Sequence, residues 1–181
     1  MLKFAFIINV PGESPETYSA VYENEESYSI IAGTGDMNMA KDYVKKLADD
    51  GFTLFNLCGD FDDEITEQMQ EMAGDSVKIR HANYNLNELV KLDRLRTMRN
   101  YGVIIVMDGV EKPHEVVLRS KECDTRAIFV KDMPQARRAA RRLVEKRVNF
   151  IELCSWFDTP RLEIVVKAID GVVPIGTCGE L

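Results

Sequence analysis

The stretch Leu57-Cys58-Gly59-Asp60-Phe61-Asp62 returns 96 residues later as Leu153-Cys154-Ser155-Trp156-Phe157-Asp158. The similarity extends outward from this stretch at the same offset, in the pairs Asp36 and Asp132, Met37 and Met133, Leu47 and Leu143, Val77 and Val173, and Ile79 and Ile175. A constant offset over such a length indicates that one structural unit has been duplicated. We therefore expect two α/β repeats, 1–98 and 99–181, of which the second is diverged and truncated.

Each copy contains one clearly amphipathic helix. Its apolar positions follow the i, i+3, i+4, i+7, i+8 spacing of a single buried face, with Ala40, Tyr43, Val44, Leu47 and Ala48 in the first copy and Ala136, Ala139, Ala140, Leu143 and Val144 in the second. Asp36 and Asp132 precede these helices and are expected to cap their first turns. Gly51 is expected to end the first helix, and Arg147 occupies its position in the second copy.

Short apolar runs before and after this helix predict buried strands. They cover 4–10, 28–32, 52–58 and 77–79 in the first copy and 103–107, 126–130, 148–154 and 173–175 in the second. Shorter alternating segments at 18–23 and 115–119 leave open whether a hairpin forms. Strands that alternate with helices through short connections predict parallel pairing by right-handed crossovers.

The predicted fold class is therefore α/β, built from a tandem duplication of a βαβαβ-type unit with mostly parallel strands. We expect a pseudo-twofold, two-lobed arrangement. A single closed barrel-like sheet is the alternative, although 181 residues is short for an eightfold barrel. A third helix at 85–98 is expected only in the first copy, where it would join the two repeats and turn four residues inward: Leu86, Leu89, Val90 and Leu92.

Composition limits the partners of the protein. The net charge is −7, and it is concentrated in 1–98, which holds 18 acidic and 9 basic side chains, so nucleic acid is an unfavourable partner. No apolar run approaches the ~18–20 residues that cross a bilayer, so no membrane partner is expected. Four cysteines without a C-x-x-C motif indicate reduced thiols and a cytoplasmic location. An acidic copy joined to a near-neutral one is compatible with a homo-oligomer.

The candidate site lies where the predicted parallel strands end, because ligands of such sheets bind beyond the carboxyl ends of the strands. In the first copy the candidate ligand-binding residues are Cys58, Gly59, Asp60, His81 and Asn83. Cys58 is also the candidate nucleophile, since a helix N-terminus favours thiolate. The alternative is that Cys58 is a small buried apolar residue.

Metal and phosphate sites have weaker support in the sequence. Cys58 with His81, or Cys154 with Cys178, would supply two ligands where a structural zinc site needs four, so no metal is expected. Gly33-Thr34-Gly35-Asp36 is similar to a phosphate-binding loop but lacks the full spacing, which favours a plain loop with a helix cap. The sequence assigns no cofactor. The basic face of 137–147 is interpreted as solvated or as docking to an acidic partner.

At Leu57-Cys58-Gly59-Asp60-Phe61 the chain resembles a family of short bacterial and archaeal single-domain proteins of unknown function. The whole first copy matches the order of elements in that family. This order is an apolar strand ending near Pro-Gly, a helix, a strand ending in Leu-Cys-Gly-x-Phe, a further strand and a last helix. In the second copy Ser155-Trp156 replaces the glycine, while Val173-Pro174-Ile175-Gly176 keeps the later strand. The resemblance implies two fused domains and implies nothing about a substrate.

Two functions follow from these observations. The first is binding of a small molecule, an anionic or carbonyl compound, at the carboxyl ends of the strands, with enzymatic activity left open. The second is a non-catalytic interaction or structural module that acts as a built-in pseudo-dimer.

Overall fold

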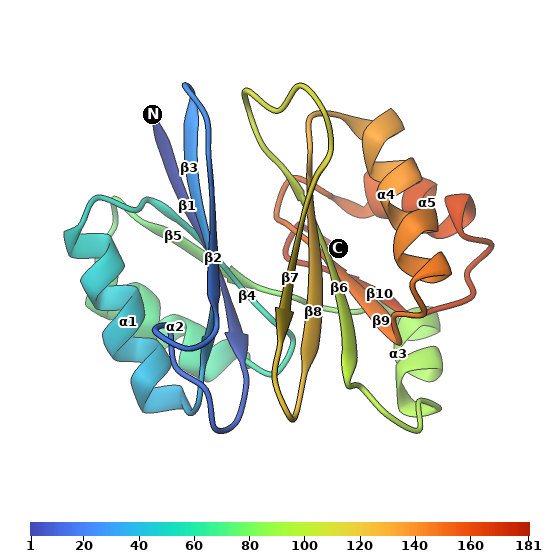
Figure 1. Cartoon of the computed structure of the whole chain (residues 1–181). Helices are drawn as coiled ribbons and strands as arrows, with labels where there is room; N and C mark the ends of the chain where they lie inside the picture. The colour runs from blue at the N-terminus through green and yellow to red at the C-terminus, as the bar shows by residue number, and fades with distance from the viewer. The chain divides into compact units, whose positions relative to one another are not determined.

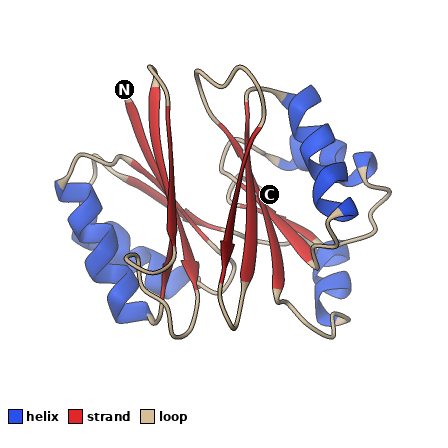
Figure 2. Ribbon diagram, in the orientation of Figure 1, coloured by secondary structure: helices blue, strands red, loops and turns tan.

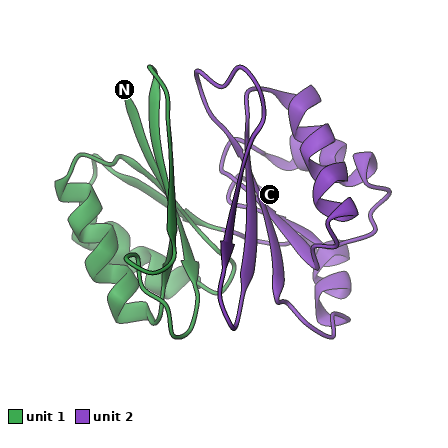
Figure 3. Ribbon diagram, viewed as in Figure 1, with its two compact units in different colours: residues 1–81 green, residues 82–181 purple.

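The computed structural model describes residues 1–181, which form two compact units, Met1–His81 and Ala82–Leu181 (Figures 1 and 3). Each unit contains one open five-stranded sheet with helices (Figure 2). The predicted two-lobed α/β fold is confirmed, and the alternative of one closed sheet is wrong. No helix combines the length and the apolar character that crossing a bilayer requires.

The sheet of the first unit has the strand order β2-β3-β1-β4-β5. Its elements are β1 (Leu2–Asn9), β2 (Ser19–Glu23), β3 (Ser27–Thr34), α1 (Met37–Asp49), β4 (Leu54–Leu57), α2 (Asp63–Ala73) and β5 (Lys78–His81). All neighbours are parallel except β2, which pairs antiparallel with β3 and so forms the hairpin that the sequence left open. The helices α1 and α2 lie side by side on one face of the sheet (Figure 2).

The second unit repeats this order as β10-β9-β6-β8-β7. Its elements are α3 (Leu86–Asp93), β6 (Asn100–Val106), β7 (His114–Arg119), β8 (Asp124–Val130), α4 (Met133–Glu145), β9 (Phe150–Leu153), α5 (Thr159–Ala168) and β10 (Ile175–Thr177). The antiparallel strand β7 again lies at one edge. The central strands β1 and β6 are buried along most of their length, as expected for apolar strands in the middle of a parallel sheet.

The predicted helix caps are confirmed. The Asp36 side chain accepts the Met39 amide at 2.8 Å, and Asp132 accepts the Gln135 amide at 3.0 Å. After the helix, Gly51 adopts a left-handed conformation with φ 90°, and its counterpart Arg147 adopts φ 63°. The second copy therefore holds an arginine in a backbone conformation that favours glycine.

The third predicted helix differs from expectation. It ends at Asp93 rather than at residue 98, and Leu86, Leu89 and Val90, which were expected to face inward, are exposed. The buried residue is Glu88, whose carboxylate accepts the Ile175 amide at 3.0 Å and the Lys91 ammonium at 2.7 Å. The apolar pattern failed as a guide because charged hydrogen bonds, rather than leucines, attach this helix to the second unit.

The segment Ala82–Asp93, here called the strap, belongs to the second unit. Asn83 and Thr177 exchange backbone hydrogen bonds of 2.9 Å in an isolated antiparallel bridge. The Tyr84 ring lies directly over Gly176, where a Cβ atom would come within 2.6 Å of it. The sequence predicts a first repeat that includes residues up to 98, whereas the contacts divide the chain after His81.

A buried carboxylate anchors the strap. Glu152 on β9 is 1% exposed and accepts hydrogen bonds from the Tyr84 hydroxyl at 2.6 Å and the Tyr101 hydroxyl at 2.5 Å, one on each oxygen. Such charge-assisted bonds are stronger than neutral ones and offset the cost of burying the carboxylate. In the first unit the counterparts of Glu152 and Tyr101 are Asn56 and Phe4, so the cluster belongs to the second unit alone.

Candidate functional site

The expected site residues of the first unit lie at the carboxyl ends of two adjacent strands, β4 and β5. In the sheet register Leu57 of β4 stands between Ile7 of β1 and His81 of β5, so Cys58 and His81 end neighbouring strands. We call the group Asn9, Cys58, Gly59, Asp60, Asp63 and His81 the first-unit rim.

Asn9 links two of the expected residues. Its backbone amide donates to the Cys58 sulfur at 3.3 Å, and its side-chain Nδ2 donates to Asp60 Oδ2 at 3.2 Å. Cys58 is buried, whereas Gly59 and Asp60 are exposed. The Asp60 carboxylate is therefore oriented by an amide and remains accessible to solvent.

His81 forms a second polar pair on the rim. Its Nε2 lies 2.7 Å from Asp63 Oδ1, at the first residue of α2. The His81 side chain is 11% exposed and that of Asp63 is 90% exposed. A carboxylate bonded to one ring nitrogen fixes the orientation of an imidazole, so this pair holds the ring in a defined position at the strand end.

Asn83 is placed differently from the other expected residues. It lies in the strap, and its backbone pairs with Thr177 of the second unit. The structure thus groups Cys58, Gly59, Asp60 and His81 on the first-unit rim and adds Asn9 and Asp63. A comparison of the two copies marks both positions, because Val106 and Thr159 stand there in the second copy, but the partners Asp60 and His81 could not be read from the sequence.

The equivalent rim of the second unit has lost these groups. In the strand register, which is shifted by one residue for the central strands, Val106 replaces Asn9. At the offset of 96, Trp156 replaces Asp60, Thr159 replaces Asp63 and Thr177 replaces His81. The side chains that replace them interact with nearby residues. The Arg161 guanidinium lies over the Trp156 ring, 4.1 Å from its centre, and the Thr177 hydroxyl donates to the Phe157 carbonyl at 2.7 Å. The Glu180 carbonyl accepts the Thr159 amide at 2.9 Å, which covers the start of α5.

The two equivalent cysteines share one geometry. The Val106 amide donates to the Cys154 sulfur at 3.3 Å, as Asn9 does to Cys58. Burial raises the pKa of Cys154 to about 11, so this residue is a neutral thiol at physiological pH. Both sulfurs are buried and accept a backbone amide from the neighbouring strand end, whereas the Asp60 and Asp63 carboxylates are exposed. The role of Cys58 as a nucleophile stays a prediction.

The glycine-rich loops are explained by close packing. A Cβ atom on Gly35 would lie 2.8 Å from the Glu13 carbonyl oxygen, and one on Gly179 would lie 1.9 Å from the Phe157 carbonyl oxygen. These glycines allow backbone segments to approach each other. No three histidine, cysteine or acidic side chains come together as a metal-binding group.

Comparison with known proteins defines the family. The model of a family described as "Family of unknown function (DUF6506)" matches residues 2–97 and again 99–179. No curated protein matches the chain in sequence. A crystal structure of a carbohydrate transporter from Acidothermus cellulolyticus 11B, in complex with myo-inositol, is similar at 8% identity and a TM-score of 0.31, covering 97% of this chain and 73% of that one. This likeness is too low to carry an argument about function. The chain belongs to the DUF6506 family and contains two tandem copies of the domain that defines it.

Proposed function

We propose that the protein binds a small polar molecule at the first-unit rim. The observation that carries this proposal is the pair of oriented side-chain contacts, Asn9–Asp60 and Asp63–His81, at adjacent strand ends of one copy only. The second copy has the same strand order with none of these four residues. Because the fold forms without them, they are not required by the architecture, and ligand binding accounts for their presence.

The charge of the rim favours one of the two expected ligand classes. Asp60, Asp62 and Asp63 stand together at this edge, and Asp62 is used as the cap of α2. Like charges repel an anion placed beside them. We therefore favour a neutral carbonyl compound that also carries hydroxyl groups, with the hydroxyls donating to Asp60 and the carbonyl accepting from the imidazole or the Asn9 amide.

Nuclear magnetic resonance of the histidine side chains tests this proposal. The chain has two histidines, His81 on the rim and His114 on β7 of the second unit, so the second serves as an internal control. The probes are dihydroxyacetone, a neutral hydroxyketone, and glyoxylate, an anionic carbonyl compound. We expect dihydroxyacetone to shift the His81 resonances saturably, glyoxylate to do so more weakly, and His114 to be unaffected.

Two variants make this test specific. Asp60→Ala removes the oriented carboxylate and should weaken the His81 response, whereas Asp75→Ala removes an exposed carboxylate from the turn before β5 and should leave it intact. Equal responses from His81 and His114, or none from either histidine with both probes, would rule out this ligand class at the rim.

The alternative function, a non-catalytic interaction module acting as a built-in pseudo-dimer, draws support from the duplication itself. Its test is the association state of the first unit alone. Because the strap packs on the second unit, the chain should be cut after His81 rather than after Met98. Self-association of residues 1–81 in sedimentation experiments would favour this function, and a folded monomer would argue against it.

A further inference from the structure

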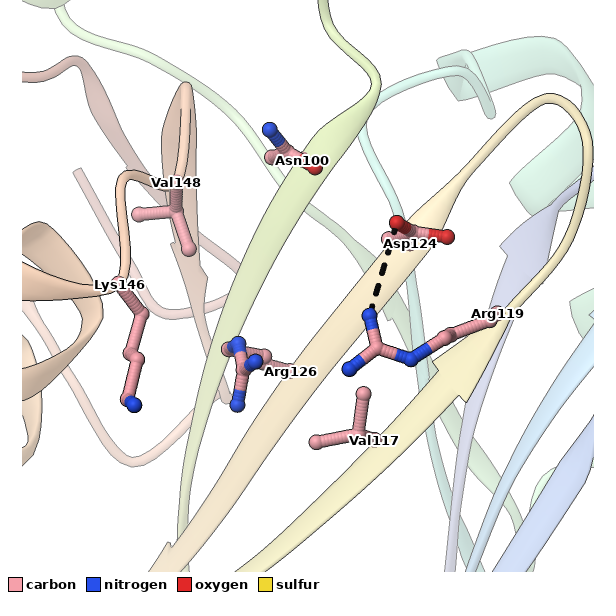
Figure 4. Close-up of a pocket in the computed structure, with 7 residues that line it drawn as sticks. All are labelled: Asn100, Val117, Arg119, Asp124, Arg126, Lys146 and Val148. Carbon is pink, nitrogen blue, oxygen red and sulfur yellow. Dashed lines mark ion pairs between the residues drawn. The ribbon is translucent and has the colours of Figure 1, made fainter.

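The second unit contains a surface pocket at the opposite end of its sheet from the rim. It has a volume of about 120 Å³ and lies where β6 and β8 begin, β7 ends and α4 passes into β9. Figure 4 shows three basic side chains from different elements around it: Arg119 from β7, Arg126 from β8 and Lys146 from the end of α4. Val117 and Val148 form its apolar part.

The pocket carries an excess of positive charge. Asp124 is its one acidic side chain, and this carboxylate lies 3.8 Å from Arg119 in a loose ion pair. Arg126 donates through Nη1 to Glu115 at 2.7 Å, which leaves the other donors of its guanidinium available. The Lys146 ammonium forms no ion pair or hydrogen bond.

Glu115, just outside the pocket, does not cancel this charge. Its carboxylate also accepts Arg142 Nε at 2.6 Å and is therefore shared between two arginines. Burial raises its pKa, but the hydrogen bonds from Arg142 and Arg126 together bring the pKa below the ordinary value, so it stays ionised at neutral pH. The pair Glu115 and Arg142 is neutral, and the pocket residues themselves remain net positive.

The first unit fills the same place. Phe52 stands where the second unit has Val148, and Tyr28 stands where it has Asp124. These two rings pack edge to face at 6.0 Å, and the Lys3 ammonium lies 5.7 Å from the centre of the Phe52 ring. The second unit thus opens a space that its sister packs with aromatic rings.

The charges change together with the volume. The second-unit residues Arg119, Arg126 and Lys146 correspond to Glu23, Ile30 and Asp50 of the first unit. Two acidic residues and one apolar residue have thus become basic, while Tyr28 has become Asp124 and Lys3 has become Asn100, so the net charge of these positions changes from −1 to +2. Strand order has been kept. The fold therefore does not require these cations, and an anionic ligand explains them.

We propose that this pocket binds a phosphate group, either inorganic phosphate or the phosphate end of a small monoester. Three cations that approach from different elements suit an anion with several outward oxygens, and arginine pairs with phosphate through two parallel hydrogen bonds. The volume is well below the ~300–1,000 Å³ of pockets that enclose whole drug-sized ligands, so it holds a single group. No aromatic side chain lines it, which excludes stacking of a nucleobase.

The test is calorimetric titration of the full-length protein with inorganic phosphate and with glycerol phosphate at constant ionic strength. We expect saturable binding of at least one probe, and tighter binding of the monoester would identify the group as the end of a small molecule. Lys146→Asp introduces the residue of the first unit, Asp50, into the pocket. The control is Arg138→Asp on the exposed face of α4, outside the pocket, which likewise introduces the first-unit residue, Asp42. The first substitution should weaken binding at least about tenfold, and the second, with the same change of charge, by less than about twofold.

A substitution that changes the volume of the pocket but not its charge distinguishes binding inside the pocket from general attraction of an anion to a basic surface. Val148→Phe restores the aromatic side chain of the first unit without altering any charge, and it should abolish phosphate binding while the protein remains folded. Equal weakening by Lys146→Asp and Arg138→Asp, undiminished binding to the Val148→Phe protein, or no saturable binding of either probe to the wild-type protein would each overturn the proposal. Because this site lies in the second unit, its failure would leave the His81 experiment on the rim unaffected.

Discussion

The two units have the same strand order and differ in where they place polar side chains. The first unit carries Asn9, Asp60, Asp63 and His81 at the carboxyl ends of its strands, and the second unit has Val106, Trp156, Thr159 and Thr177 there. At the amino ends the contrast is reversed, because the first unit packs Tyr28 and Phe52 where the second has a basic pocket.

This comparison is informative because each copy is a control for the other. A feature present in both, such as the capping aspartates or the buried cysteines, is explained by the shared architecture. A polar feature present in one copy alone is not required by the shared architecture: it either stabilises that copy, as the buried Glu152 cluster does, or it stands exposed, as Asp60 does. The difference therefore separates residues that build the shared domain from residues that are particular to one copy, and the two binding proposals rest on the exposed members of the second group.

The largest expected effect concerns the buried carboxylate of the second unit. Glu152→Ala should lower the free energy of unfolding by about 3 kcal/mol, because it leaves the Tyr101 hydroxyl buried without its partner and creates a cavity. Urea denaturation followed by circular dichroism reports on both units, and the fluorescence of Trp156, the single tryptophan, reports on the second unit. The matched substitution Asn56→Ala in the first unit should cost less. A cost below about 1 kcal/mol for Glu152→Ala would contradict the role assigned to this carboxylate.

A somewhat smaller effect is expected at alkaline pH. The pKa of Cys154 is raised to about 11 from an ordinary value near 9, so the native thiol stays neutral while the unfolded one ionises. Its contribution to stability is complete below pH ~9 and is lost as the pH rises to ~11, by at most about 3 kcal/mol at 1.36 kcal/mol per pKa unit.

The measurement is the Trp156-reported unfolding free energy between pH 9 and 11. Cys154→Ala should flatten this decline, and Cys58→Ala should leave it unchanged because it alters the other unit. A decline as steep in the Cys154→Ala protein as in the wild type would contradict the assignment of the pKa shift to burial of this thiol.

The smallest effect is expected at the position after α1 and α4 where the backbone has a positive φ, which is occupied by Gly51 in the first copy and by Arg147 in the second. Arg147→Gly should stabilise the second unit by about 0.5–1 kcal/mol, since glycine adopts the observed φ of 63° without steric cost. The reciprocal change, Gly51→Ala, should destabilise the first unit by a similar amount. Thermal unfolding of both variants measures the pair, and a destabilised Arg147→Gly protein would indicate that the arginine side chain has a role of its own.

Much of the architecture could be predicted from local patterns. The offset of 96 residues identified the duplication, and the helix spacing and the capping aspartates identified α1 and α4. Part of the candidate site followed from the rule that parallel strands place their ends on one edge. Asn9 and Asp63 were missed because their importance depends on partners 51 and 18 residues away, Asp60 and His81.

The contacts of the strap had no local signal, and the sequence marked only Lys146 of the pocket, as part of the basic face of 137–147. The apolar residues of α3 predicted a leucine-lined inner face, but Glu88 is the buried residue because distant groups, the Ile175 amide among them, compensate its charge. Arg119, Arg126 and Lys146 are ordinary surface cations along the chain and form a pocket only when three elements converge.

The sequence by itself determined the duplication, the α/β class and the edges on which strand ends meet, because periodicity and capping act over a few residues. The tertiary structure alone decided which unit the strap joins, which oriented polar pairs form on the rim, and where a missing aromatic ring leaves a charged hollow. These features depend on contacts between residues far apart in the chain, whose energies come from burial and geometry that no local pattern contains.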